Sequence, residues 1–141
     1  MKLIVYISAL TLLFTACKKD ESLVKTQEMD GFHSVEINSA FTITLVEDVS
    51  YYVEIKGNSS FVDQCQTSVT DSTLYISSNA SNKWTHPSDN AVEIVIHAPP
   101  LKLVTANETC FISSSTPITS NEFGLVMKSK ANEADLTLKS L

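Results

Sequence analysis

The sequence predicts an all-β protein, and three observations support this fold class. Several segments alternate apolar and polar residues with a period of two, the period at which side chains reach one face of a strand. Serine, threonine and β-branched residues are abundant and favour strands, whereas the 141 residues include only three glycines and four prolines. The third observation is a short motif that recurs in the last third of the chain.

The alternation marks individual strands. We expect strands near residues 41–47, 51–56 and 92–103, because the apolar residues of each segment fall on one face. These residues are Phe41, Ile43 and Leu45, then Tyr51, Val53 and Ile55, then Val92, Ile94 and Ile96. No segment has a long helical stripe, and only residues 59–66 fit a short helical turn.

The recurring motif is the triplet Ala-Asn-Glu, which begins at Ala106 and again at Ala131. The interval of 25 residues is typical of stacked solenoid rungs. Each copy is interpreted as a turn followed by a strand. Asn107 and Asn132 suit such turns, because asparagine tolerates the left-handed backbone conformation better than other non-glycine residues.

The first 16 residues are interpreted as a lipoprotein signal peptide. Lys2 supplies a positive start, and the apolar stretch up to Phe14 is too short to cross a bilayer. The residues before Cys17 resemble a bacterial lipobox, in which the cysteine is acylated with fatty acids such as palmitate and becomes the first residue of the mature protein. The alternative is an ordinary secretory signal with a chance cysteine.

Lys19, Asp20 and Glu21 resemble a surface-export signal, in which a lysine and two acidic residues follow the lipidated cysteine. The alternative is a solvated run of mixed charge. With either interpretation, residues 17–30 are expected to be a flexible tether and residues 31–141 a single domain.

The composition argues against a nucleic-acid partner. The chain contains no arginine, and its formal net charge is −6. Phosphate recognition depends on lysine and arginine fields and on the bidentate geometry of arginine.

Residues from Gly31 to the C-terminus resemble the putative auto-transporter adhesin, head GIN domain family of bacterial envelope proteins. The resemblance is carried by "GFHSVEINSAFTITLVEDVSYYVEIKGN", "TLYIS", "VEIVIHAPPLKLV" and the repeated strand-turn units. It implies a right-handed parallel β-helix-like solenoid with no established catalytic activity. The family usually has Ser-Gly in turns where this chain has Ala-Asn, and it usually has more rungs. We therefore expect a truncated solenoid with an open last rung, whose unpaired strand edge favours self-association.

No residue pattern indicates catalysis, a metal site or a cofactor. His33, His86 and His97 are far apart and lack metal-ligand spacing. Glu36, Glu54, Glu93 and Glu108 are expected on outer strand faces or in turns. No nucleophile-elbow pattern surrounds a serine. We therefore predict a protein that is not an enzyme.

Four further residues are candidates for modification or binding. Cys65 and Cys110 form either a disulfide, in an oxidising envelope, or two buried thiols. Asp71-Ser72-Thr73 resembles a short O-glycosylation motif, with Ser72 as the acceptor. Trp84 either contacts a glycan or protein ligand or covers the end of the core.

Together these observations predict a cell-envelope lipoprotein that acts as a non-catalytic binding or adhesion module. We expect it at the outer membrane, held by its lipid anchor and exposed at the cell surface. The alternatives are a solenoid polysaccharide lyase or hydrolase, or a periplasmic envelope scaffold.

Overall fold

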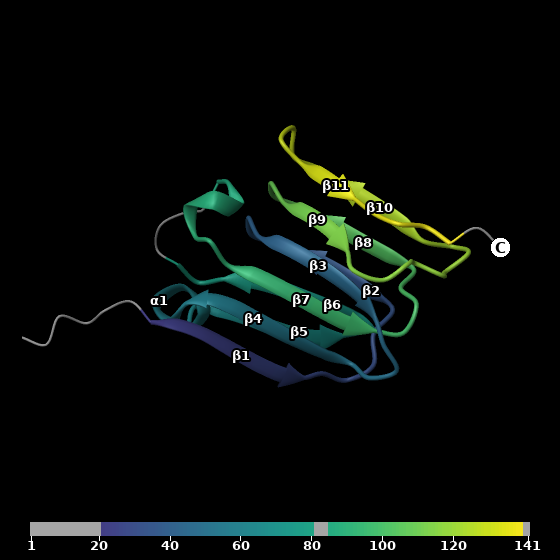
Figure 1. Ribbon diagram of the computed structural model, residues 1–141, viewed down its shortest axis with the longest axis horizontal. Coiled ribbons are helices and arrows are strands. Elements are labelled where there is room, and N and C mark those ends of the chain that lie inside the picture. The colour runs from purple at the N-terminus through teal and green to yellow at the C-terminus, as the bar shows by residue number, and fades with distance from the viewer. Residues whose placement is uncertain (1–20, 81–84, 140–141) are drawn as a thin grey trace, which may run out of the picture.

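The computed structural model describes residues 21–80 and 85–139, and this part of the chain is mostly β (Figure 1). Two mixed sheets face each other, and neither closes into a barrel. The strands are β1 (Ser22–Glu28), β2 (Ser34–Ile37), β3 (Thr42–Glu47), β4 (Tyr52–Asn58), β5 (Cys65–Thr70), β6 (Thr73–Ser78), β7 (Glu93–Ala98), β8 (Leu103–Ala106), β9 (Phe111–Ser114), β10 (Gly124–Met127) and β11 (Glu133–Asp135). Short helices α1 (Ser59–Val62) and η1 (Pro87–Asp89) lie between strands.

The chain builds four two-strand units, each with one strand in either sheet. The units are β2/β3, β6/β7, β8/β9 and β10/β11, and neighbouring units pair in parallel. The six-stranded sheet has the order β1-β4-β7-β3-β9-β11, and the five-stranded sheet has the order β10-β8-β2-β6-β5. The β2/β3 unit therefore lies in the middle of the stack, between the second and third units of the sequence.

This order confirms the all-β class but does not confirm a solenoid. A simple β-helix stacks its rungs in sequence order, whereas here β8/β9 packs against β2/β3 instead of β6/β7. In addition, β1, β4 and β5 pair antiparallel with their neighbours. These antiparallel strands end the stack on one side.

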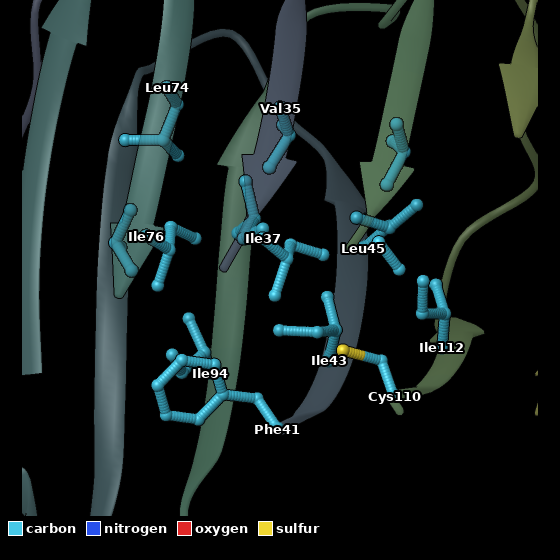
Figure 2. Close-up of a cluster of buried hydrophobic side chains, with 14 of the residues drawn as sticks. Val35, Ile37, Phe41, Ile43, Leu45, Leu74, Ile76, Ile94, Cys110 and Ile112 are labelled. Atoms are coloured by element: carbon cyan, nitrogen blue, oxygen red, sulfur yellow. The ribbon is translucent and has the colours of Figure 1, made fainter. Parts of the chain in front are cut away.

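The core lies between the two sheets and consists of the inward-facing residues of each strand (Figure 2). Val35, Ile37 and Ile76 of the five-stranded sheet face Ile43 and Ile94 of the six-stranded sheet, and all five side chains are buried. Burying one such side chain contributes about 1.5 to 3 kcal/mol. The alternating burial of β3 and β4 matches the pattern expected from the sequence, whereas β7 buries Ile94, Val95 and Ile96 in succession.

The first strand corrects the expectation of a flexible tether for residues 22–28, whereas residues 17–20 lie outside the described residues. Residues Ser22–Glu28 form β1, which pairs along its whole length with β4. The strand is polar, so composition alone suggests a tether, but backbone pairing with β4 supplies the hydrogen bonds that order it. Leu23 of β1 also packs against the core.

The repeated Ala-Asn-Glu triplets are not structurally equivalent. The parallel register places Ala106 of β8 opposite Met127 of β10, so the second triplet lies after the matching position. Asn107 and Asn132 also do not have the expected left-handed backbone, since the only non-glycine residues with positive φ in the described parts of the chain are Asp71, Ser72 and Ala91. Both asparagines instead act through their side-chain amides.

Candidate functional site

The most distinctive surface of the protein is the outward side of the five-stranded sheet, which we call the hydroxyl-amide face. Its side chains alternate with the buried residues of the same strands, and the register aligns them in rows across the sheet. We define the face by its polar residues and Tyr75, which are Ser34, Glu36, Asn38, Gln66, Ser68, Thr70, Thr73, Tyr75, Ser77, Thr105 and Asn107. The apolar side chains of Leu103 in β8 and Val126 in β10 are exposed on the same side of the sheet. Glu36 is the one charged residue of the hydroxyl-amide face, and its other polar side chains are neutral donors and acceptors.

A hydrogen-bond network fixes the centre of this face. The Asn107 amide nitrogen donates to Glu36 Oε1 at 2.9 Å and to Asn38 Oδ1 at 2.6 Å. Asn107 follows β8, and the parallel pairing of β8 with β2 brings these residues together across about 70 positions of sequence. The network holds three polar side chains in fixed positions, which reduces the entropy that a ligand must overcome.

Tyr75 provides the aromatic group of the face. It lies in β6, paired with Ser68 of β5, and is half-buried. Tyr75 also borders an open hollow of about 490 Å³ at the β5 edge, lined mostly by polar side chains such as Gln66 and Ser77. An aromatic ring beside amides and hydroxyls suits a ligand that has both apolar faces and many hydroxyls.

The outward side of the six-stranded sheet has different chemistry. His97 Nε2 lies 2.9 Å from Glu54 Oε2, and His97 Nδ1 lies 3.4 Å from Asp48 Oδ2. The Tyr52 ring stacks on the His97 ring with centroids 3.9 Å apart. We interpret the histidine as a cross-strand link, because both of its nitrogens face carboxylates.

Two carboxyl groups have pKa values shifted in the direction opposite to that of a general acid. Hydrogen bonds from backbone N–H groups, chiefly that of Val49, lower the pKa of Asp48. The pKa of Asp89 is lowered by the N–H groups of His86 and Thr85. A catalytic acid at neutral pH needs a raised pKa. Within residues 21–80 and 85–139, no three His, Cys, Asp or Glu side chains are placed to hold a metal ion.

The structure contains the two cysteines as separate buried thiols. Cys65 begins β5 at one edge of the fold, whereas Cys110 precedes β9, and both are free. Cys65 Sγ donates to the Phe61 carbonyl and Cys110 Sγ to the Ser39 carbonyl, each at 3.4 Å. The structure thus has both cysteines as buried free thiols, the second of the two alternatives; a disulfide formed in an oxidising envelope stays a prediction.

The other candidate residues have different outcomes. Ser72 is exposed in the two-residue turn between β5 and β6. Glu21 is exposed, and its carbonyl accepts a hydrogen bond from the Ser59 N–H. Cys17, Lys19, Asp20 and Trp84 lie outside the described residues.

Sequence reasoning missed Tyr75 and Asn38 as candidate site residues. The period-two pattern of "TLYIS" places Tyr75 on the face opposite Leu74 and Ile76, so the sequence could have predicted that Tyr75 points outward. The residues that surround Tyr75 could not be predicted, because β2 pairs with both β6 and β8, which are distant from it in the sequence.

A comparison with protein families identifies the domain. The family described as "putative auto-transporter adhesin, head GIN domain" matches residues 31–140. The chain belongs to this family. The description of the head GIN domain is that of an adhesin and names no enzymatic activity. A search of curated proteins finds no match to the chain.

Solved structures share the fold of this head GIN domain at low sequence identity. A putative adhesin from Bacteroides fragilis has a TM-score of 0.67 at 16% identity, covering 77% of this chain and 50% of its own. A putative adhesin from Parabacteroides merdae has a TM-score of 0.63 at 14% identity, covering 76% and 44%. A putative lipid binding protein from Parabacteroides distasonis has a TM-score of 0.60 at 17% identity, covering 75% and 46%. The chain thus spans about half the length of these structures.

The helices in the described part of the head GIN domain are short. None of the helices there is long and apolar enough to cross a bilayer.

Proposed function

We propose that this protein is a lipid-anchored module of the bacterial cell envelope that binds glycans through its hydroxyl-amide face. The observation that carries the proposal is the array of hydroxyls and amides around Tyr75, in which the Asn107 amide holds Asn38 and the one carboxylate, Glu36, in a single network. Membership of a family described as an adhesin supports a binding role.

A glycan fits this surface for physical reasons. Sugar hydroxyls donate and accept hydrogen bonds, as do the amide and hydroxyl side chains of the face. The apolar side of a sugar ring can pack on Tyr75. Each contact is weak on a flat surface, but many copies on one membrane convert weak binding into avidity. The parallel stacking of the two-strand units supports a short solenoid-like scaffold that keeps this face flat.

The test compares glycan binding by the native protein and by Tyr75→Ala on an array of surface polysaccharides. We expect Tyr75→Ala to weaken binding about two- to tenfold, since an aromatic contact is worth about 0.5 to 1.5 kcal/mol beyond its buried area. Phe111→Ala is the matched control, because Phe111 is a half-buried aromatic on the outward side of the other sheet. Equal binding by the native protein and Tyr75→Ala would exclude this face as the site.

Other functions have less support. A lipid-binding function would follow the name of the Parabacteroides distasonis protein. However, the apolar pocket lined by Leu45, Leu101, Ile118 and Phe123 has a volume of only about 10 Å³, which is room for about one water molecule. Polysaccharide cleavage would need a carboxyl group with a raised pKa, and the shifts at Asp48 and Asp89 are downward.

The proposed location is the outer face of the outer membrane, with Cys17 lipidated and Lys19, Asp20 and Glu21 as the export signal. Protease treatment of intact cells tests this location, with these three charged residues changed to alanine in a second strain. Cleavage of the native protein and protection of the variant supports surface exposure. Protection of both would favour a periplasmic scaffold.

Two subsidiary proposals concern modification and assembly. The exposed turn position of Ser72 supports O-glycosylation there, which a mass shift lost in Ser72→Ala would test. The edge strands β10 and β11 support self-association, because every β11 side chain and Val126 of β10 are exposed. Sedimentation of the purified protein over a concentration series would detect it, and a monomer at every concentration would contradict it.

A further inference from the structure

A second surface lies on the other sheet, next to the end of β1. An open hollow of about 580 Å³ is lined by Thr26, Glu28, Met29, Ser50, Tyr51 and Tyr52; we call it the tyrosine hollow. The antiparallel register places Glu28 of β1 opposite Tyr52 of β4, and the Met29 N–H donates to the Tyr51 carbonyl. Figure 1 shows the end of β1 beside the start of β4.

Both tyrosine rings are held in place. The Tyr51 ring meets the buried Phe32 ring edge to face, with centroids 5.4 Å apart. One side of the Tyr52 ring stacks on His97 of β7. Since the strand order is β1-β4-β7, the other side of Tyr52 faces Glu28 and the hollow.

The charges around the hollow are mainly negative. Glu28 is exposed on its wall, and Glu54 is the next outward residue of β4 after Tyr52. The pKa of Tyr52 is raised, first by desolvation and then by the charges of Asp48 and Glu54. The one imidazole beside the hollow, His97, is already held between these two carboxylates.

The backbone of β1 offers further contacts next to the hollow. The Met29 N–H donates to the Tyr51 carbonyl, and the Ser59 N–H donates to the Glu21 carbonyl. With the register of the pair, these hydrogen bonds show that the odd-numbered residues of β1 point their backbone N–H and C=O groups at β4. In an antiparallel pair the alternate residues point away. The backbone groups of Thr26 and Glu28 therefore face the open edge, where an extended peptide can pair with them.

We propose that the tyrosine hollow binds a lysine or arginine side chain from a basic, extended segment of a partner protein. The cation contacts the face of Tyr52 and the carboxylate of Glu28, and the partner's backbone pairs with the edge of β1. An amino sugar carries a similar cation but has no backbone N–H and C=O groups that could pair with the edge of β1. The unpaired backbone groups of this edge therefore favour a protein as the partner. This site is separate from the hydroxyl-amide face and does not depend on its proposed function.

The experiment measures binding of blocked peptides of seven residues, the length of β1, to the purified full chain by fluorescence anisotropy. One peptide alternates threonine with arginine, a second has glutamine for arginine, and a hexamer of glucosamine serves as the amino-sugar probe. We expect binding of the arginine peptide alone, with weakening as salt rises from about 0.05 M to about 0.5 M because exposed charges are screened.

Two variants test the site itself. Glu28→Gln and Tyr52→Leu should each weaken the arginine peptide about two- to fivefold, the range for one exposed ion pair or cation-π contact. Glu133→Gln is the matched control, because Glu133 is an exposed acid in the opposite edge strand β11. Thermal unfolding checks that Tyr52→Leu, which loses its contact with His97, remains folded.

The outcomes separate the explanations. An equal loss in Glu28→Gln and Glu133→Gln would show general attraction to an acidic protein and would overturn the proposal. Equal binding of the glutamine peptide, or binding of the glucosamine hexamer in place of the arginine peptide, would also overturn it. Amide shifts at Thr26 and Glu28 on titration with the arginine peptide would place it at the β1 edge, and shifts confined to other strands would refute that placement.

Discussion

The side chain of Asn90 makes two buried hydrogen bonds, and replacing it tests how much they stabilise the fold. Its side chain is almost fully buried, with 1% exposure. The amide nitrogen donates to the Ala40 carbonyl at 2.7 Å, and Oδ1 accepts from the Val92 N–H at 2.7 Å. Asn90 thus joins the turn before β3 to the start of β7, two strands that lie side by side.

Asn90→Ala leaves one carbonyl and one N–H without these partners. A buried polar group that loses its partner costs about 1 to 3 kcal/mol, so the two groups together give an expected loss of about 2 to 6 kcal/mol. A domain of this size has a free energy of unfolding of about 5 to 15 kcal/mol. We therefore expect Asn90→Ala to remove a large part of the stability.

Urea unfolding followed by circular dichroism measures the free energy of unfolding of each variant. Asn121→Ala is the control, because Asn121 is exposed in a turn, and surface substitutions usually change stability by less than about 0.5 kcal/mol. A loss of less than about 0.5 kcal/mol in Asn90→Ala would refute the reasoning. A changed slope with denaturant would show that the comparison is not two-state.

Three further predictions concern the thiols, an acidic cap and a turn. Burial raises the pKa of Cys65 and of Cys110 to about 11, so both thiols are protonated and unreactive at about pH 8. In a protein with Cys17→Ser, a thiol reagent at that pH should therefore label neither cysteine until denaturant is added. Rapid labelling of the native protein would contradict this prediction. The lowered pKa of Asp89 stabilises the folded state above its ordinary value of 3.8, and this contribution is lost as pH falls through the folded value. The difference in melting temperature between the native protein and Asp89→Asn should therefore shrink as the pH falls below 3.8 and through the lowered pKa of Asp89. A difference that stays constant over this pH range would argue against the prediction. Replacing Asp71-Ser72 by Asn-Gly, a pair favoured in two-residue hairpin turns, should raise stability by about 1 kcal/mol in urea unfolding. Both native residues have positive φ, which costs a non-glycine residue roughly 1 to 2 kcal/mol, and a loss of stability would show that the native pair makes contacts of its own.

The sequence was most informative where one residue pattern decides the local structure. The strands around Ile43 and Val53 were predicted because apolar and polar residues alternate and the apolar face is buried. The strand around Ile94 was predicted from its apolar β-branched residues, although Val95 on its other face is also buried. The helical turn at Phe61 and Val62 was also predicted. Strand β1 was missed because its residues are polar, and its order comes from pairing with β4.

The arrangement of units and the candidate sites could not be predicted. The hydroxyl-amide face depends on the alignment of Asn107 with Asn38, which lie 69 residues apart. The tyrosine hollow depends on β1 pairing, where Glu28 meets Tyr52. Neither pairing leaves a local pattern, because parallel and long-range registers are selected by the whole fold. The triplet repeat was misleading for the same reason, since Ala106 aligns with Met127.

The central position of the β2/β3 unit has a consequence for how the chain folds during synthesis. This unit leaves the ribosome before the units that pack on either side of it, because synthesis proceeds from the N-terminus. It can therefore act as a template, first for β6/β7 on one side and later for β8/β9 on the other. Each later unit can then pack against a neighbour that has already been synthesised, whereas β1 can pair only after β4 has been synthesised. Moving the β2/β3 segment to the C-terminus by circular permutation would keep the contacts but reverse this order of assembly.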